Sequence, residues 1–281
     1  MTVVSVLDPV RSTASPDVAV DERAASWRAL GTQVDLRVDD PRALATATLV
    51  ARGVLDEVDA TCSRFRADSD LSVANRLAGQ WVPISPVLVA ALRVAIRAAA
   101  RTDGLVDPCL GEVLVTAGYD RTFVQLLQGQ PGGAAQLPTP PDPQAWRRLQ
   151  LGGGRLLVPA GVSLDLGATG KAFAADLVAA AVLERIDGPL VVSVGGDVRA
   201  IGDPVEWPCD IATDRAALAA DGPVCRVLLP SGGLAVSSVT ARRWVRGGRT
   251  WHHVVDPRTA RPTRGPWRAV AAYETTAALA N

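Results

Sequence analysis

Lysine and histidine are almost absent from this chain. Lys171 is the only lysine among 29 basic residues, and the two histidines, His252 and His253, are neighbours. Because arginine is used at every other basic position, the single lysine indicates a site that needs a compact ammonium rather than a planar guanidinium. Chance retention on a surface helix is the alternative. Both imidazoles lie just before an Asp-Pro-Arg-Thr turn at residues 256–259.

Other absences exclude whole classes of protein. The four cysteines form no CxxC pair, which excludes a zinc ribbon and a dithiol redox motif, so we expect buried free thiols. Acidic and basic residues balance at 29 each, without the positive excess of a general nucleic-acid binder. No apolar run approaches the roughly 20 residues that cross a bilayer, and no signal-peptide pattern opens the chain. We expect a cytoplasmic enzyme or binding protein for a small molecule, without membrane insertion.

Composition and patterning predict an α+β fold of two lobes. The chain has 281 residues, of which 48% are apolar, and this is enough to bury a large core. Residues 1–24 are polar and aperiodic, so we expect a flexible leader before one domain at 25–281. Residues 128–144 are dense in glycine and proline and form a long loop that divides the chain. Helices dominate before this loop, and strands with one central helix follow it.

Hydrophobic periodicity and capping residues place the individual elements. An N-cap serine followed by proline, Ser85-Pro86, is typical of a helix start, and glycine at 188 of a helix end. Glycines between short apolar runs indicate turns between strands. The expected helices are 41–63, 85–104 and 168–188, and the expected strands are 26–38, 162–167, 189–202, 225–230 and 233–239.

The segment DLGATGKAFAAD, residues 165–176, has the outline of a phosphate site. Gly167, Ala168 and Gly170 allow a ligand to approach the backbone, helix N-terminal amides attract anions, and Lys171 adds a cation. The spacing matches neither GxxxxGK[ST] nor GxGxxG. A tight turn that needs small residues for packing is the alternative.

Three further segments are weaker candidates. In SVGGDVRAIG, residues 193–202, paired glycines indicate close contact with a ligand or another backbone, and Asp197 is a candidate partner for a ribose or a metal. A β-bulge at the glycines is the alternative. The polar segment 62–76 is typical of a loop that closes over a ligand, with Asn75 offering an amide, or of a solvated loop. In the segment 104–111, Asp107 stands directly before a proline turn, which makes it a similar weak candidate for a ligand-binding loop.

Taken together, these segments resemble the ApbE family, the FAD:protein FMN transferases. The resemblance spans residues 27–281 and is specific because seven segments occur in order. It implies a T-fold-related, two-lobed α+β fold with mixed or antiparallel sheets and flanking helices. It also implies a magnesium-dependent transferase that cleaves FAD, attaches FMN through a phosphoester to a threonine of an acceptor protein, and releases AMP. The segments are ALGT, SRFRADSDLSVAN, GLVDP, LDLGATGKAFAAD, VSVGGDVRAIG, GLAVSSVTARRW and HHVVDPRTARP.

The resemblance assigns roles to individual residues. His253 matches a histidine near the phosphates with a base role, and Lys171 matches the lysine of the central helix; these are the expected catalytic residues. For His253 the alternative is a strand-end histidine that stabilises the following turn. The Gly170 carbonyl matches a backbone oxygen that binds magnesium. The expected residues around the flavin nucleotide are Leu30, Phe65, Arg66, Ala67, Asn75, Asp107, Phe173, Asp176 and Val255.

The C-terminal segment departs from the family pattern. Leu279 stands where the resemblance expects an acid, and the sequence stops at Asn281 before the expected hydroxyl. Because magnesium prefers hard oxygen ligands, usually including carboxylate, the departure predicts weak metal binding. Three functions stay open: an active flavin transferase, an FAD-binding protein with reduced or lost transfer, and a metal-dependent FAD pyrophosphatase in which water replaces threonine.

Overall fold

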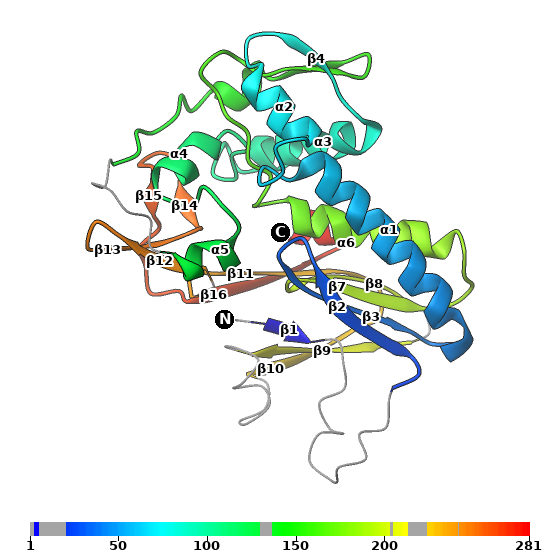
Figure 1. Cartoon of the computed structure of the whole chain (residues 1–281). Coiled ribbons are helices and arrows are strands. Elements are labelled where there is room, and N and C mark those ends of the chain that lie inside the picture. The colour runs from blue at the N-terminus through cyan, green and yellow to red at the C-terminus, as the bar shows by residue number, and fades with distance from the viewer. Residues whose placement is uncertain (1–2, 6–20, 130–136, 203–204, 213–223, 241) are drawn as a thin grey trace. The chain divides into compact units, whose positions relative to one another are not determined.

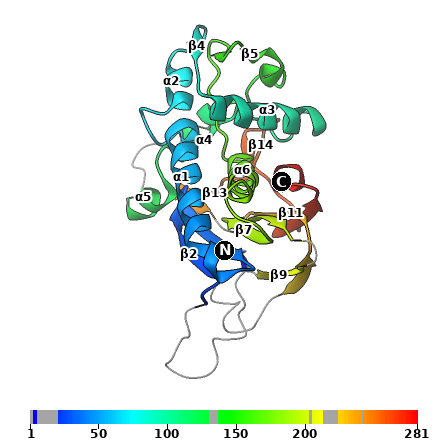
Figure 2. The same ribbon diagram turned by 90° about the vertical axis from the view of Figure 1, so that its right-hand side faces the viewer.

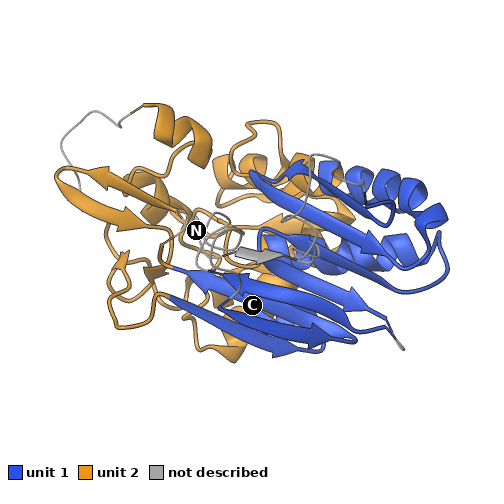
Figure 3. Cartoon of the chain, turned by 90° about the horizontal axis from the view of Figure 1, so that it is seen from below, with its two compact units in different colours: residues 1–56, 171–238, 269–281 blue, residues 57–170, 239–268 orange. Residues whose placement is uncertain are grey.

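The chain forms two compact units, each assembled from separate stretches of sequence (Figures 1 and 3). The computed structural model describes residues 3–5, 21–129, 137–202, 205–212, 224–240 and 242–281. Unit 1 comprises residues 1–56, 171–238 and 269–281, and unit 2 comprises residues 57–170 and 239–268. We expected the division at the loop 128–144. This loop instead belongs entirely to unit 2, and its residues 130–136 lie outside the described residues.

Unit 1 contains a six-stranded sheet in which all neighbouring strands are antiparallel. In one interior pair of strands Val34 faces Val194 and Leu36 faces Val192, and all four side chains are fully buried. These four side chains share one face of the sheet, because residues i and i+2 of a strand point to the same side, and they form an apolar surface against which another layer packs. In spatial order the strands are β16 (Ala269–Glu274), β11 (Gly232–Ser238), β8 (Asp197–Ile201), β7 (Leu190–Val194), β3 (Thr32–Val38) and β2 (Ala24–Ala29).

Helices cover one face of this sheet and a small second sheet covers the other (Figure 2). The helical layer consists of α6 (Gly170–Leu183) and the first part of α1 (Leu44–Cys62), which follows η2 (Pro41–Ala43). A four-residue helix, α8 (Ala277–Ala280), packs against β11 and β16. On the opposite face, Trp207, Cys209 and Leu229 join the sheet residues in one apolar cluster. The second sheet consists of β1 (Val3–Ser5), β9 (Trp207–Ala212) and β10 (Cys225–Leu229).

Unit 2 is built from short helices and small sheets. Its apolar cluster joins α4 and α5 to the C-terminal hairpins through Val113, Leu126, Trp244 and Trp251. The helices are α2 (Asp70–Arg76), α3 (Pro86–Arg101), α4 (Gly111–Thr116), α5 (Phe123–Gln128) and η3 (Ala145–Arg148). The sheets are β4 (Trp81–Pro83) with β6 (Arg155–Leu157) and β5 (Gln150–Gly152), β12 (Arg243–Arg246) with β13 (Arg249–His252), and β14 (Val255–Asp256) with β15 (Arg261–Pro262).

The longer helices confirm the predictions from periodicity and caps. α3 begins at Pro86 with Ser85 as its N-cap, whose hydroxyl accepts a hydrogen bond from the Leu88 amide at 3.2 Å. α1 and α6 lie where the apolar spacing places them, although α6 ends at Leu183, before the expected glycine stop. The antiparallel sheets with flanking helices confirm the α+β class. Of the expected buried thiols, Cys109 and Cys209 are buried, whereas Cys225 is exposed.

Three of the predicted strands are wrong, and one of them, residues 189–202, forms the β7–β8 hairpin. Residues 26–38 form a hairpin rather than one strand, because Leu30 and Gly31 take φ angles of 50° and 67° and reverse the chain. Residues 162–167 form no strand, since their backbone groups bond to loops and to the Asn75 side chain. Within the expected leader, Val3–Ser5 pairs with β9, and residues 6–20 lie outside the described residues. Among the described helices, none is long and apolar enough to cross a membrane.

Candidate functional site

In unit 1 the single lysine forms an ion pair with a fully buried carboxylate. Lys171, in the first turn of α6, donates from Nζ to Oδ2 of Asp197 at 2.5 Å. The Asp197 side chain is 0% exposed and that of Lys171 is 21% exposed. Because a buried carboxylate is unfavourable without a cation, the pair holds the ammonium at a defined position. Lys171 was an expected site residue; Asp197 was a weaker candidate.

Two tight turns lie next to this ion pair. Gly195 and Gly196, with φ angles of 64° and 99°, form the two-residue turn of the β7–β8 hairpin, and Asp197 follows directly. The segment is therefore a hairpin turn and not the β-bulge considered from sequence. The turn also requires glycine sterically, since a Cβ at Gly195 would lie 2.5 Å from Oγ1 of Thr32. The Gly195 amide bonds to the Gln33 carbonyl at 2.8 Å.

Leu30 occupies the first position of the neighbouring β2–β3 turn. Its φ angle of 50° lies in the left-handed region, which costs a residue with a Cβ about 1–2 kcal/mol. Strained residues of this kind cluster at binding sites, where surrounding structure maintains them. Leu30 was expected near the flavin, and this conformation is consistent with that expectation. The turn places Leu30 two residues before Thr32, which contacts Gly195.

Asp176 has different contacts from those expected. Its two carboxylate oxygens accept hydrogen bonds from the amides of Ala277 and Ala278, each at 2.9 Å, and Arg199 lies 3.5 Å away. Burial raises its pKa above the ordinary value, whereas the two amides and Arg199 act in the opposite direction. Asp176 therefore caps α8, and its carboxylate is used within the protein rather than held ready for a nucleotide. Phe173, on the same helix, is 7% exposed.

In unit 2 the loop that precedes α6 is organised by Asp165. Its carboxylate forms an ion pair with Arg64 and accepts a hydrogen bond from the Gly167 amide at 2.7 Å. Its own amide bonds to the Pro108 carbonyl at 2.8 Å. These contacts connect the first residues of the predicted phosphate loop with the segment that carries Asp107. Sequence reasoning missed both Arg64 and Asp165 as partners.

The Arg64 guanidinium packs against two neighbouring aromatic rings, whose centroids are 5.5 Å apart. Its Cζ is 4.3 Å from the Phe65 ring centroid and 4.8 Å from that of Tyr119, within cation–π range. The Tyr119 ring also lies 5.4 Å from that of Trp244, and its hydroxyl accepts a hydrogen bond from Arg242. Tyr119 is buried, but Phe65 is 38% exposed. Phe65 is therefore partly accessible to solvent, and its place beside a flavin stays a prediction.

Asn75 and Asp107 stabilise unit 2 from within. The Asn75 side chain donates to the Leu164 carbonyl at 2.9 Å and accepts from the Leu164 amide at 2.7 Å. Asp107 is buried and accepts from the Cys109 amide at 2.8 Å, and burial raises its pKa. Both were expected to contact the nucleotide. The structure gives the Asn75 amide and Oδ1 of Asp107 backbone partners within unit 2, and a contact of either residue with the nucleotide stays a prediction.

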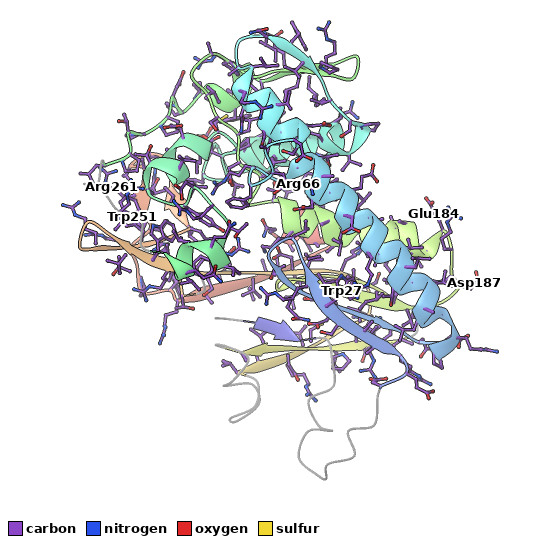
Figure 4. All side chains as sticks on the ribbon, in the orientation of Figure 1. Trp27, Arg66, Glu184, Asp187, Trp251 and Arg261 are labelled. Atoms are coloured by element: carbon purple, nitrogen blue, oxygen red, sulfur yellow. The ribbon has the colours of Figure 1, made fainter. Side chains whose placement is uncertain are left out.

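Arg66 and Ala67 lie on an exposed loop of unit 2. Arg66, labelled in Figure 4, forms ion pairs with Asp68 at 3.0 Å and Asp59 at 3.4 Å. The Ala67 carbonyl accepts a hydrogen bond from Arg76 at 2.7 Å. Because Arg66 is already paired with two carboxylates, its charge is partly neutralised. A role for it toward a nucleotide remains a prediction.

The two histidines have different surroundings. His252, the last residue of β13, is buried, and its Nε2 lies 3.1 Å from the Thr263 carbonyl oxygen. Burial lowers its pKa. His253 is half-buried, and its amide bonds to the Arg242 carbonyl at 3.3 Å. Val255 belongs to the apolar cluster of unit 2. The structure thus gives His252 a packing role.

The described residues do not fit a preformed magnesium site. Among them no three His, Cys, Asp or Glu side chains come together as a metal-ligating group. Asp176 accepts from two amides, and Asp197 is paired with Lys171. Gly170, the expected carbonyl ligand, begins α6 and its amide bonds to the Leu166 carbonyl at 2.6 Å. A carbonyl without neighbouring carboxylates makes a poor site for a hard cation.

Known proteins resemble this chain in both sequence and fold. An FAD:protein FMN transferase of Rhodobacter capsulatus is 31% identical over 200 residues, which are 67% of this chain and 36% of that protein. An FAD:protein FMN transferase of Treponema pallidum is 26% identical over 277 residues, covering 86% of this chain and 72% of that protein. The chain thus spans about a third of the first relative's length and nearly three quarters of the second's.

Solved structures share the fold. The ApbE protein of Thermotoga maritima has a TM-score of 0.74 and 24% identity, with 92% of this chain and 83% of that chain covered. The flavinyl transferase ApbE of Pseudomonas stutzeri has a TM-score of 0.70 and 22% identity, with 92% and 81% covered. At these identities the likeness establishes the fold. The sequence model of the ApbE family matches residues 30–281, and the chain therefore belongs to the ApbE family.

Proposed function

We propose that this protein is a flavin transferase that takes FAD, attaches FMN through a phosphoester to a threonine of an acceptor protein, and releases AMP. Family membership over residues 30–281 carries the proposal. The relatives of Rhodobacter capsulatus and Treponema pallidum are both named FAD:protein FMN transferase. That FMN is attached to a threonine of the acceptor protein is inferred from the sequence resemblance.

Lys171 is the residue proposed to bind the phosphates of FAD. An ammonium group has three N–H donors, and its bond to Asp197 at 2.5 Å uses one of them. The remaining donors suit phosphate oxygens, whose charge must be neutralised during transfer. Because Asp197 is fully buried and fixed at the β7–β8 turn, it orients the ammonium while the nucleotide is absent. Positioning of this kind is the main contribution that a protein makes to phosphoryl transfer.

His253 is the proposed base for the acceptor hydroxyl. A neutral imidazole accepts a proton near neutral pH, and removing the threonine proton makes its oxygen a better nucleophile toward phosphorus. The oxygen–phosphorus bond to FMN forms as the bond to AMP breaks, and AMP leaves with the electron pair. His253 is half-buried at the end of β13, where the neighbouring Trp251 belongs to the apolar cluster of unit 2.

Two other functions follow if transfer is weak. Among the described residues no cluster of three or more ligating side chains is arranged to hold a metal ion. This favours an FAD-binding protein with reduced turnover. Water in place of threonine would make the protein an FAD pyrophosphatase, with free FMN and AMP as products. The phosphates of bound FAD would bring oxygens of the kind on which magnesium binds in many enzymes.

One assay separates the three functions. Purified protein is incubated with FAD and MgCl2, with or without a library of threonine-containing peptides, and AMP is measured by chromatography. A matched library with valine in place of threonine keeps the side-chain shape and removes the hydroxyl. A transferase releases AMP only with the threonine library, a pyrophosphatase releases it in every case, and a binding protein releases none. The second or third result would overturn the proposal. Lys171→Met and His253→Gln are the variants expected to lose transfer.

A further inference from the structure

The C-terminal segment Thr276–Asn281 is attached to the rest of unit 1 by a small number of polar contacts. The Thr276 hydroxyl accepts from the Leu279 amide at 3.2 Å and caps α8. The Asp176 carboxylate accepts from the Ala277 and Ala278 amides, one oxygen to each. A helix of four residues has too few internal hydrogen bonds to be stable alone. The position of this segment therefore depends on contacts with the rest of unit 1, and Asp176 supplies two of them.

Arg199 and Gly233 complete this attachment. Arg199, on β8, donates to the Thr275 carbonyl at 2.7 Å, and its Nε lies 3.5 Å from the Asp176 carboxylate. Gly233, on β11, lets the segment approach closely, because an added Cβ would overlap the backbone of Thr276 and Ala277. Three separate elements, α6, β8 and β11, thus hold the same short piece of chain.

The far end of the segment reaches the buried partner of the single lysine. Asn281 places its side-chain amide 3.5 Å from Oδ1 of Asp197, while Lys171 occupies Oδ2. Both oxygens of the Asp197 carboxylate are therefore contacted, one by the Lys171 ammonium and the other by the side-chain amide of Asn281. Together with the packing of α8 against β8 and β11, this arrangement encloses Asp197, which is 0% exposed.

We propose that Asp176 is a positioning residue for the Lys171–Asp197 pair, acting through the C-terminal segment. It anchors α8, and α8 with Asn281 keeps water from Asp197, so that the carboxylate holds the lysine in one orientation. The inference rests on the proposed function in one respect, that Lys171 binds the phosphates of FAD. The anchor itself is a property of unit 1 alone and is tested without any nucleotide.

Hydrogen exchange tests the anchor directly. The Asp176→Asn variant keeps one acceptor oxygen and replaces the other by an NH2 donor, so at least one of the Ala277 and Ala278 amides should exchange at least about tenfold faster, the factor expected when a hydrogen bond to a charged group is lost. Asp187→Asn, an exposed change just after α6, is the matched control and should leave these amides unchanged. Unchanged exchange in Asp176→Asn would overturn the anchor.

A glycine pair gives an independent test of the same contact. Gly233→Ala should expose the Ala277 and Ala278 amides by steric displacement, with every ionisable group retained. Gly53→Ala is its control, since Gly53 lies within α1 with nothing within 4 Å of an added Cβ. Faster exchange in the first variant and not in the second supports the anchor. Equal exchange in both would contradict it.

FAD affinity tests whether the anchor acts through Lys171. Asp176→Asn should weaken FAD binding at least about tenfold in the natural protein, by the same loss of charged hydrogen bonds. It should have little further effect in a Lys171→Met background, because the residue that it positions is gone. Equal effects in both backgrounds would show a purely structural role and overturn the proposal. If the natural protein binds no FAD, the proposed function fails, while the exchange results still decide the anchor.

Discussion

Loss of Lys171 should destabilise the folded protein as well as its nucleotide site. In Lys171→Met the stem of the side chain is retained, but Asp197 keeps its charge in a position that is 0% exposed. Removing one partner of a fully buried pair costs about 3–5 kcal/mol, most of it from the charge left behind. The Lys171 side chain is 21% exposed, and Asn281 offers a second contact to Asp197 at 3.5 Å. We therefore expect the lower end, about 3 kcal/mol.

Urea unfolding of the nucleotide-free protein measures this loss. For a domain of this size, a loss of about 3 kcal/mol in the free energy of unfolding corresponds to a fall in melting temperature on the order of 6–12 °C. The double variant Lys171→Met, Asp197→Asn should recover much of the stability, because it leaves no buried charge, and its coupling energy isolates the pair. A loss below about 1 kcal/mol in Lys171→Met would be that of a surface ion pair. It would refute the claim that Asp197 fixes the ammonium.

Three further predictions concern Asn75, Asp107 and His252. Asn75→Ala should cost about 1–3 kcal/mol in urea unfolding, because the buried Leu164 amide and carbonyl lose their partners; a smaller cost would contradict its bridging role. Burial raises the pKa of Asp107 above 3.8, so the folded state binds the proton more tightly and stability falls as pH rises from about 4 through the folded pKa. Asp107→Asn should remove this fall, and identical pH profiles of the unfolding midpoint would refute the assignment. Burial lowers the pKa of His252 below 6.5, so stability falls as pH drops from about 6.5 to the folded pKa, a loss that His252→Gln should abolish in the same measurement.

Local signals in the sequence were sufficient for the long helices. Ser85 and Pro86 define the start of α3 through a capping hydrogen bond and a preset φ angle, both of which involve only neighbouring residues. The hairpin at Gly195-Gly196 was missed, since residues 189–202 were predicted as one strand, although paired glycines between two apolar runs are typical of a two-residue turn. The β2–β3 turn was also missed, because it places leucine rather than asparagine or glycine at a positive φ angle.

The partners of the site residues were beyond local reasoning. Lys171 and Asp197 are 26 residues apart, and Arg64 and Asp165 are 101 apart. No periodic pattern connects positions so distant; only the pairing of strands and the packing of helices brings them together. Asp176 illustrates the same limit. The resemblance aligns the residue type with a family position, but the α8 amides that occupy its oxygens lie 101 and 102 residues further along the chain.

The mass of the acceptor after incubation with FAD tests the central claim most directly. The threonine peptides are mixed with protein, FAD and MgCl2, and fragment-ion mass spectrometry locates any addition. Our account predicts one FMN, less water, on the threonine oxygen, together with one AMP for each modified peptide, and no addition in Lys171→Met or on the valine peptides. AMP with free FMN and unmodified peptides, or an addition at a residue other than threonine, would contradict it.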